Sequence, residues 1–201
     1  MKRIPPWFFL FLKGVPAALA SLFAFTSRTG GDRLFQLAIT IGLLACLAGD
    51  VGIDLSFIAG MGFFSIAQLV FIVTYAGHAL GMTLKPESLI ITLTVIIIMV
   101  IYVVFILKFL QGSEKGLGSL KIPVTVYSSL LALHFCAAIL LWLTAAIIEG
   151  IVIVMGAFVF VVSDTTLAVR EFHHRPENSV IKVMATYYLA LLFISLSILV
   201  F

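Results

Sequence analysis

Charged residues are scarce in this chain. They make up 10% of its 201 residues, whereas 63% are hydrophobic, and the mean hydropathy is +1.26. A soluble domain carries charge on about a quarter of its residues, so this composition excludes an ordinary soluble fold. The net charge of +3 does not indicate nucleic acid, because the basic residues mostly adjoin apolar runs, as membrane topology requires. We therefore expect a polytopic membrane protein with no nucleic-acid partner.

Cysteines, metal-binding spacings and nucleotide-binding motifs are also rare or missing. Cys46 and Cys136 both lie in apolar segments, which indicates small core residues rather than a disulfide framework. The four histidines show no paired spacing typical of a zinc site. The chain has no G-x-S-x-G elbow and no phosphate-binding glycine loop. We therefore expect neither a metal nor a cofactor.

Long apolar runs, by contrast, fill the chain, and seven of them reach the roughly 20 residues that a membrane-spanning helix needs. Turn-forming or charged clusters such as SRTGGDR, GMTLKPE and QGSEKGLGSLK separate them. No segment between them is long enough for a soluble domain. The prediction is an all-α fold, a single transmembrane helical bundle of about seven spans over residues 1–201. The predicted spans are 5–25, 33–52, 56–79, 87–110, 121–146, 149–170 and 180–201.

Charged residues at the edges of these runs set further expectations. The first run contains Lys13 and three prolines, so we expect it to remain as a span and not to be cleaved as a signal peptide. Asp54 and Glu149 fall beside predicted breaks, and we expect both in the turns between spans.

The distribution of Lys and Arg predicts the orientation in the membrane. On the side of the N-terminus the predicted spans place Lys2, Arg3, Lys108, Lys115, Lys121, Arg170, Arg175 and Lys182. The opposite side receives Arg28, Arg33 and Lys85. Because basic residues concentrate in cytoplasmic loops, we expect a cytoplasmic N-terminus and an external C-terminus.

Two aspartates lie inside otherwise apolar runs, Asp50 in LACLAGDVG and Asp164 in FVFVVSDTT. A carboxylate at the centre of a spanning helix costs about 3 kcal/mol or more, and such residues mark functional sites. With the predicted topology, both aspartates lie in the cytoplasmic third of the membrane. A pair of carboxylates suffices for acid–base hydrolysis, so we predict Asp50 and Asp164 as catalytic residues.

Polar and aromatic side chains from other spans fall near the same layer. Gly60, Phe64, Gln68, Phe71 and Tyr75 form a stripe at helical spacing down the third predicted span. The predicted substrate-binding residues are Lys13, Phe64, Gln68, Tyr127, Tyr187 and Tyr188. A structural alternative stays open, in which the stripe is helix packing, Asp50 caps a helix or pairs with Lys13, and Asp164 reaches headgroup water.

Three runs carry a family resemblance. AGDVGIDLSFIAGMGFFSIAQLVFIVTY, GAFVFVVSDTTLAVREF and NSVIKVMATYYLALLFISLSI resemble the YhhN family of membrane proteins, whose animal members are lysoplasmalogenases. FLKGVPAAL is similar to the family's Lys-Pro segment, with Lys13 kept and the proline displaced to Pro16. The chain departs from the family in its seven spans where members usually have eight. It also has Gln68 where a histidine is frequent, and Leu191 where a polar residue is frequent.

The resemblance implies hydrolysis of the vinyl ether of a lysoplasmalogen, a membrane lysophospholipid, to a fatty aldehyde and a glycerophospho-alcohol. Protonation of the alkenyl carbon gives an oxocarbenium ion that water attacks, so one carboxyl donates a proton while the other, ionised, stabilises the cation or activates water. Which of Asp50 and Asp164 is the acid stays open. A competing hypothesis is a small proton-coupled transporter or lipid-binding membrane protein in which the aspartates exchange protons. A purely structural subunit is a third.

Overall fold

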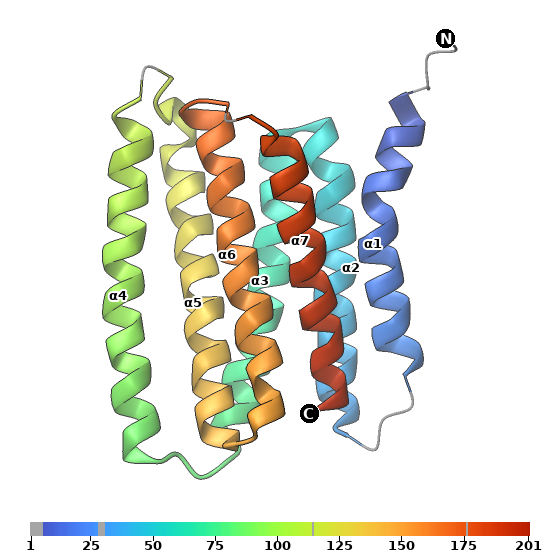
Figure 1. Cartoon of the computed structure of the whole chain (residues 1–201), viewed down its shortest axis with the longest axis vertical. Helices are drawn as coiled ribbons and strands as arrows, with labels where there is room; N and C mark the ends of the chain where they lie inside the picture. The colour runs from blue at the N-terminus through green and yellow to red at the C-terminus, as the bar shows by residue number, and fades with distance from the viewer. Residues whose placement is uncertain (1–5, 28–30, 114, 176) are drawn as a thin grey trace.

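The computed structural model describes residues 6–27, 31–113, 115–175 and 177–201, with side chains from Lys13 onward. This part of the chain folds into seven α-helices that run up and down beside one another (Figure 1). They are α1 (Pro6–Thr26), α2 (Arg33–Leu55), α3 (Phe57–Leu80), α4 (Pro86–Gln111), α5 (Lys121–Ala145), α6 (Ile151–Phe172) and α7 (Ser179–Leu196). Short 3₁₀ turns precede α5 and α6 and follow α7.

These elements confirm the prediction of an all-α membrane bundle. Helices α2 to α7 are long and apolar enough to cross a membrane, with the 3₁₀ turns extending α5, α6 and α7. In α1 the described apolar stretch is shorter, Lys13–Thr26, although the helix lies alongside the others (Figure 1). Glu149 is exposed in the turn between α5 and α6, as expected from its place between two apolar runs.

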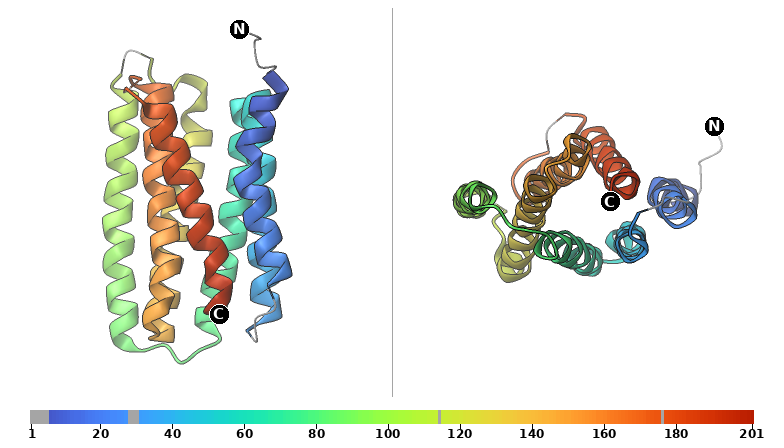
Figure 2. Two further views of the ribbon diagram at one scale, coloured as in Figure 1. Left: turned by 45° about the vertical axis from the view of Figure 1, so that its right-hand side comes forward. Right: turned by 90° about the horizontal axis from the view of Figure 1, so that it is seen from below.

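The outer surface of the bundle is hydrocarbon, most clearly on α4. Ile97, Ile101 and Phe105 on this helix are each more than half exposed. A soluble protein rarely leaves so continuous an apolar surface uncovered, whereas a lipid bilayer covers it without cost. Helices α1 and α4 lie at opposite edges of the bundle (Figure 2).

Helices α2 and α3 approach each other closely because glycines line their contact. A β-carbon built on Gly60 of α3 would lie 2.6 Å from the Cα of Ile53 on α2, and one on Gly42 would lie 2.2 Å from the ring of Phe71. The connection between the helices is a single residue, Ser56, whose N–H donates to the carbonyl of Gly52 and whose carbonyl accepts from Gly60. The two helices therefore form a tight antiparallel hairpin.

The end of the bundle where α1 starts, α2 ends and α3 starts holds Asp50, Asp54 and Asp164, and we call it the carboxylate end (Figure 1). Basic residues gather there, as the sequence predicts. At this end lie Lys108, Lys115, Lys121, Arg170, Arg175 and Lys182, and at the opposite end lie Arg33 and Lys85. Three residues of the predicted count, Lys2, Arg3 and Arg28, lie outside the described residues.

The hairpin contact gives a stability prediction. Gly60→Ala should lower the free energy of unfolding by about 1–3 kcal/mol, because the new methyl group meets the backbone of α2 and forces the helices apart. Gly62→Ala is the matched control on the same helix, since a β-carbon there has no neighbour within 4 Å. It should raise stability by about 0.5–1 kcal/mol through helix propensity alone. Denaturant or thermal unfolding in detergent measures both, and equal effects of the two changes would contradict the close contact.

Candidate functional site

Asp50 lies in the last turns of α2 and is held by a residue from the far end of the chain. The hydroxyl of Tyr187 on α7 donates a 3.0 Å hydrogen bond to Oδ2 of Asp50. The ring of Tyr187 also meets Phe64 of α3 and Phe160 of α6 edge to face, with centroids 5.8 and 5.7 Å apart. The aromatic contacts fix the position of the tyrosine, and the tyrosine fixes the carboxylate.

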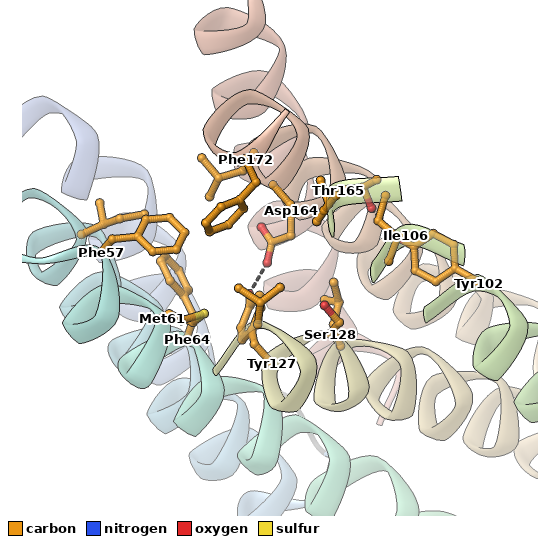
Figure 3. Close-up of a pocket in the computed structure, with 16 residues that line it drawn as sticks. Phe57, Met61, Phe64, Tyr102, Ile106, Tyr127, Ser128, Asp164, Thr165 and Phe172 are labelled. Carbon is orange, nitrogen blue, oxygen red and sulfur yellow. Dashed lines mark hydrogen bonds between the residues drawn. The ribbon is translucent and has the colours of Figure 1, made fainter. Parts of the chain in front are cut away.

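Asp164 lies on α6 about two turns before the end of the helix, and it too accepts from a tyrosine on another helix. The hydroxyl of Tyr127 on α5 donates to Oδ2 of Asp164 (Figure 3). Its neighbour Thr165 shares a hydrogen bond with the hydroxyl of Tyr102 on α4. The three helices α4, α5 and α6 are thus joined by polar contacts at the level of this carboxylate.

Both aspartates line one cavity at the carboxylate end, with a volume of about 320 Å³. Helices α1, α2, α3, α6 and α7 all contribute side chains to its wall. Of the predicted substrate-binding residues, Lys13, Phe64, Tyr187 and Tyr188 also line it. Residues distant in sequence therefore line one space.

Two ion pairs lie in the wall of this cavity. The Nζ atom of Lys13 lies 2.8 and 3.0 Å from the two carboxylate oxygens of Asp54. The Nε atom of Arg170 lies 3.2 Å from Oε1 of Glu171. All four side chains are between a quarter and a third exposed, so water screens the pairs and each contributes about 1 kcal/mol or less to stability.

The position expected for Asp54 is wrong. This residue belongs to the last turn of α2 and not to the loop, because the helix continues through Gly52 to Leu55 before the one-residue turn. Asp50 and Asp54 are four residues apart and share a helix face. Asp54, one turn nearer the membrane surface, is the aspartate that pairs with Lys13. The four-residue spacing of the two aspartates in GDVGID indicates a shared helix face. The prediction of a loop at Asp54 left this spacing unused.

A second, smaller cavity of about 50 Å³ adjoins the first at Asp164. Phe57, Phe64 and Asp164 line both cavities, and Tyr127 lines this one (Figure 3). The remaining wall is mainly apolar, with residues from each of the helices α2 to α6. Space of this size holds a few water molecules at most, and we call this small cavity the side pocket.

Gln68 lies outside the residues that line these two cavities. It is fully buried in the interior of the bundle, together with Tyr75 and His134. The imidazole of His134 stacks on the ring of Phe71 at 5.1 Å, and its two nitrogens have no hydrogen-bond partner among the described residues. The same holds for the amide of Gln68 and the hydroxyl of Tyr75. A contact between Gln68 and substrate stays a prediction.

The part of the chain that the structure describes contains no cluster of side chains that could bind a metal ion. Among those residues, no three histidine, cysteine, aspartate or glutamate side chains come together in a way that could hold an ion. The chemistry that the cavity offers comes from carboxylates, phenols and two paired cations.

The comparison with known families agrees with the resemblance seen in the sequence. Residues 8–198 match the sequence model of the YhhN family, so the chain belongs to this family. No curated protein sequence and no solved structure matches the chain.

The buried position of Gln68 gives a second prediction. Gln68→Met has nearly the same shape and removes two buried polar atoms that lack partners. It should raise the free energy of unfolding by about 1–3 kcal/mol, the usual cost of such unsatisfied groups. Steady-state kinetics of the same variant test the predicted contact between Gln68 and substrate, because loss of such a contact would raise KM. Unfolding in detergent tests the first point, and a loss of stability would show that the amide has a bound partner such as water.

Proposed function

We propose that this member of the YhhN family is an intramembrane hydrolase that cleaves the vinyl ether bond of an alkenyl lysophospholipid. The observation that carries the proposal is the pair of aspartates in one cavity, each accepting a hydrogen bond from a tyrosine on another helix. A structural role for one aspartate would not require a second in the same space. Two carboxyl groups around one reacting bond are the arrangement by which glycosidases handle an oxocarbenium ion.

The reaction consumes one water molecule. A carboxyl group donates its proton to the alkenyl carbon next to the ether-bearing carbon, and the ether oxygen shares its electrons to form the oxocarbenium ion. The second carboxyl group, ionised, stabilises this cation and accepts a proton from the water that adds to it. In the hemiacetal, the first carboxylate takes the hydroxyl proton and the second carboxyl returns its proton to the glycerol oxygen. The carbon–oxygen bond to glycerol breaks, fatty aldehyde and glycerophospho-alcohol are released, and both carboxyl groups regain their starting protonation states.

The tyrosines suit this chemistry as positioning residues. Tyr127 and Tyr187 come from α5 and α7, so each carboxylate is oriented by a helix other than its own. Orientation matters because a carboxyl group must meet the π-face of the double bond to protonate carbon. Preorganised contacts of this kind contribute to catalysis without rearrangement during the reaction.

The wall of the cavity also matches the polarity of a lysolipid. Lys13 and Arg170 offer positive charge to the phosphate, and their partners Asp54 and Glu171 are exposed enough to exchange contacts with a ligand. The Lys and Arg distribution supports a cytoplasmic carboxylate end, with the N-terminus inside and the C-terminus outside. The head group would then approach from the cytoplasm while the chain remains at the depth of the membrane.

Substrate discrimination tests the proposed reaction. Purified protein should release fatty aldehyde from an alkenyl lysophospholipid and leave the saturated alkyl analogue intact, because only the double bond allows protonation of carbon to a stabilised cation. Aldehyde detection by mass spectrometry measures both reactions, with the acyl lysophospholipid as a third substrate. Release of fatty acid from the acyl lipid without aldehyde from the alkenyl lipid would identify an esterase instead.

Substitution of the aspartates tests the two-carboxylate mechanism. Asp50→Asn and Asp164→Asn should each lower turnover by about a hundredfold or more, the scale for loss of a general acid or base. Asp54→Asn is the matched control, since it changes a carboxylate of the same cavity that is paired with Lys13, and it should lower turnover less than tenfold. Near-normal turnover in a folded Asp50 or Asp164 variant would assign that residue a structural role.

A further inference from the structure

A groove on the outside of the bundle runs between α1 and α7, with a volume of about 300 Å³. Its wall is almost entirely apolar, with Leu19 and Phe23 from α1 and Leu192 and Leu196 from α7. Leu19 and Leu192 are 60% and 50% exposed, so the groove is open toward the surrounding lipid. The two helices lie next to each other at one edge of the bundle (Figure 2).

Tyr188 connects this groove to the cavity that holds the aspartates. Its side chain lines both spaces, and among the described residues it is the one that they share. Its hydroxyl donates a 3.4 Å hydrogen bond to the backbone carbonyl of Lys13 on α1, while Lys13 reaches Asp54 with its ammonium group. The polar cavity and the apolar groove therefore adjoin at Tyr188, between the helix that carries Lys13 and the helix that carries Tyr187.

The size of the spaces decides which of them can receive a hydrocarbon chain. The side pocket next to Asp164, at about 50 Å³, has room for a few water molecules. The groove is about 300 Å³, and on α7 its wall extends from Tyr188 to Leu196, roughly 12 Å along the helix axis at 1.5 Å per residue. It leads from the middle of α1 and α7 toward the end of the bundle opposite the carboxylates.

We propose that the groove between α1 and α7 holds the hydrocarbon chain of the lysolipid while Asp50 and Asp164 act on its ether end. This inference rests on the hydrolase function proposed above and adds the site of the chain. The chain stays at membrane depth and leaves sideways past Tyr188, so the whole molecule never enters the protein. Because the groove is open to lipid, its length places no upper limit on the chain.

Photochemical cross-linking tests the chain site without relying on catalysis. The probe is a saturated alkyl-ether lysophospholipid with a diazirine in the middle of its chain, added to the purified protein in nanodiscs. Labels should concentrate on residues 16–23 and 188–196, and excess unlabelled alkyl-ether lysolipid should remove them. Equal labelling of the exposed face of α4 around Ile97 and Ile101, unaffected by the competitor, would overturn the proposal.

Bulky substitutions in the groove test its role in catalysis. Leu19→Trp and Leu192→Trp should raise KM for a hexadecenyl lysolipid by about tenfold or more and leave KM for a butenyl analogue unchanged, because the short chain ends before the groove. Leu22→Trp and Leu189→Trp are matched controls, since these leucines are 57% and 42% exposed on the same helices but do not line the groove. The controls should alter neither KM.

The outcomes separate the two proposals. An unchanged KM for the long chain in Leu19→Trp and Leu192→Trp overturns the chain site and leaves the hydrolase intact. Absence of aldehyde from the wild-type protein with both chain lengths overturns the hydrolase, and the cross-linking pattern then decides the groove by itself.

Discussion

A carboxylate at membrane depth must have hydrogen-bond donors nearby, and this requirement organises the bundle. Water is scarce there, and an unpaired charge is costly in hydrocarbon. In this protein the donors are tyrosine hydroxyls on other helices, Tyr187 for Asp50 and Tyr127 for Asp164. These contacts join α2 to α7 and α5 to α6. The same hydrogen bonds therefore position the carboxylates and hold the surrounding helices together.

The sequence predicts much of this arrangement, because the bilayer imposes strong rules on it. Apolar runs of fixed length give the spans, and the alternation of their direction brings Asp50, Asp164 and Lys13 to one end. Packing between helices that are distant in sequence follows from no such rule. The pairing of Lys13 with Asp54 depends on a one-residue turn, and the groove at Tyr188 depends on which helix lies beside α1. Such neighbours are set by side-chain fit in three dimensions.

Gln68 illustrates the limit of reasoning from helical faces. Its spacing from Phe64 places both on the inner side of α3, and both are indeed buried. Phe64 lines the cavity, whereas Gln68, one turn further from the carboxylate end, lies in the interior of the bundle. A helical face predicts burial, but the depth at which the cavity ends depends on the side chains of the helices that surround it.

The single residue between α2 and α3 is too short a connection to absorb an inserted residue. An extra residue anywhere between Asp50 and Ser56 would rotate the earlier part of α2 by roughly 100° relative to α3, since a helix makes one turn in 3.6 residues. Asp50 would then leave the cavity wall, and Gly42 would no longer oppose Phe71. The one-residue turn thus fixes the rotation of α2 relative to α3. The site tolerates insertions or deletions only in the longer connections between other helices.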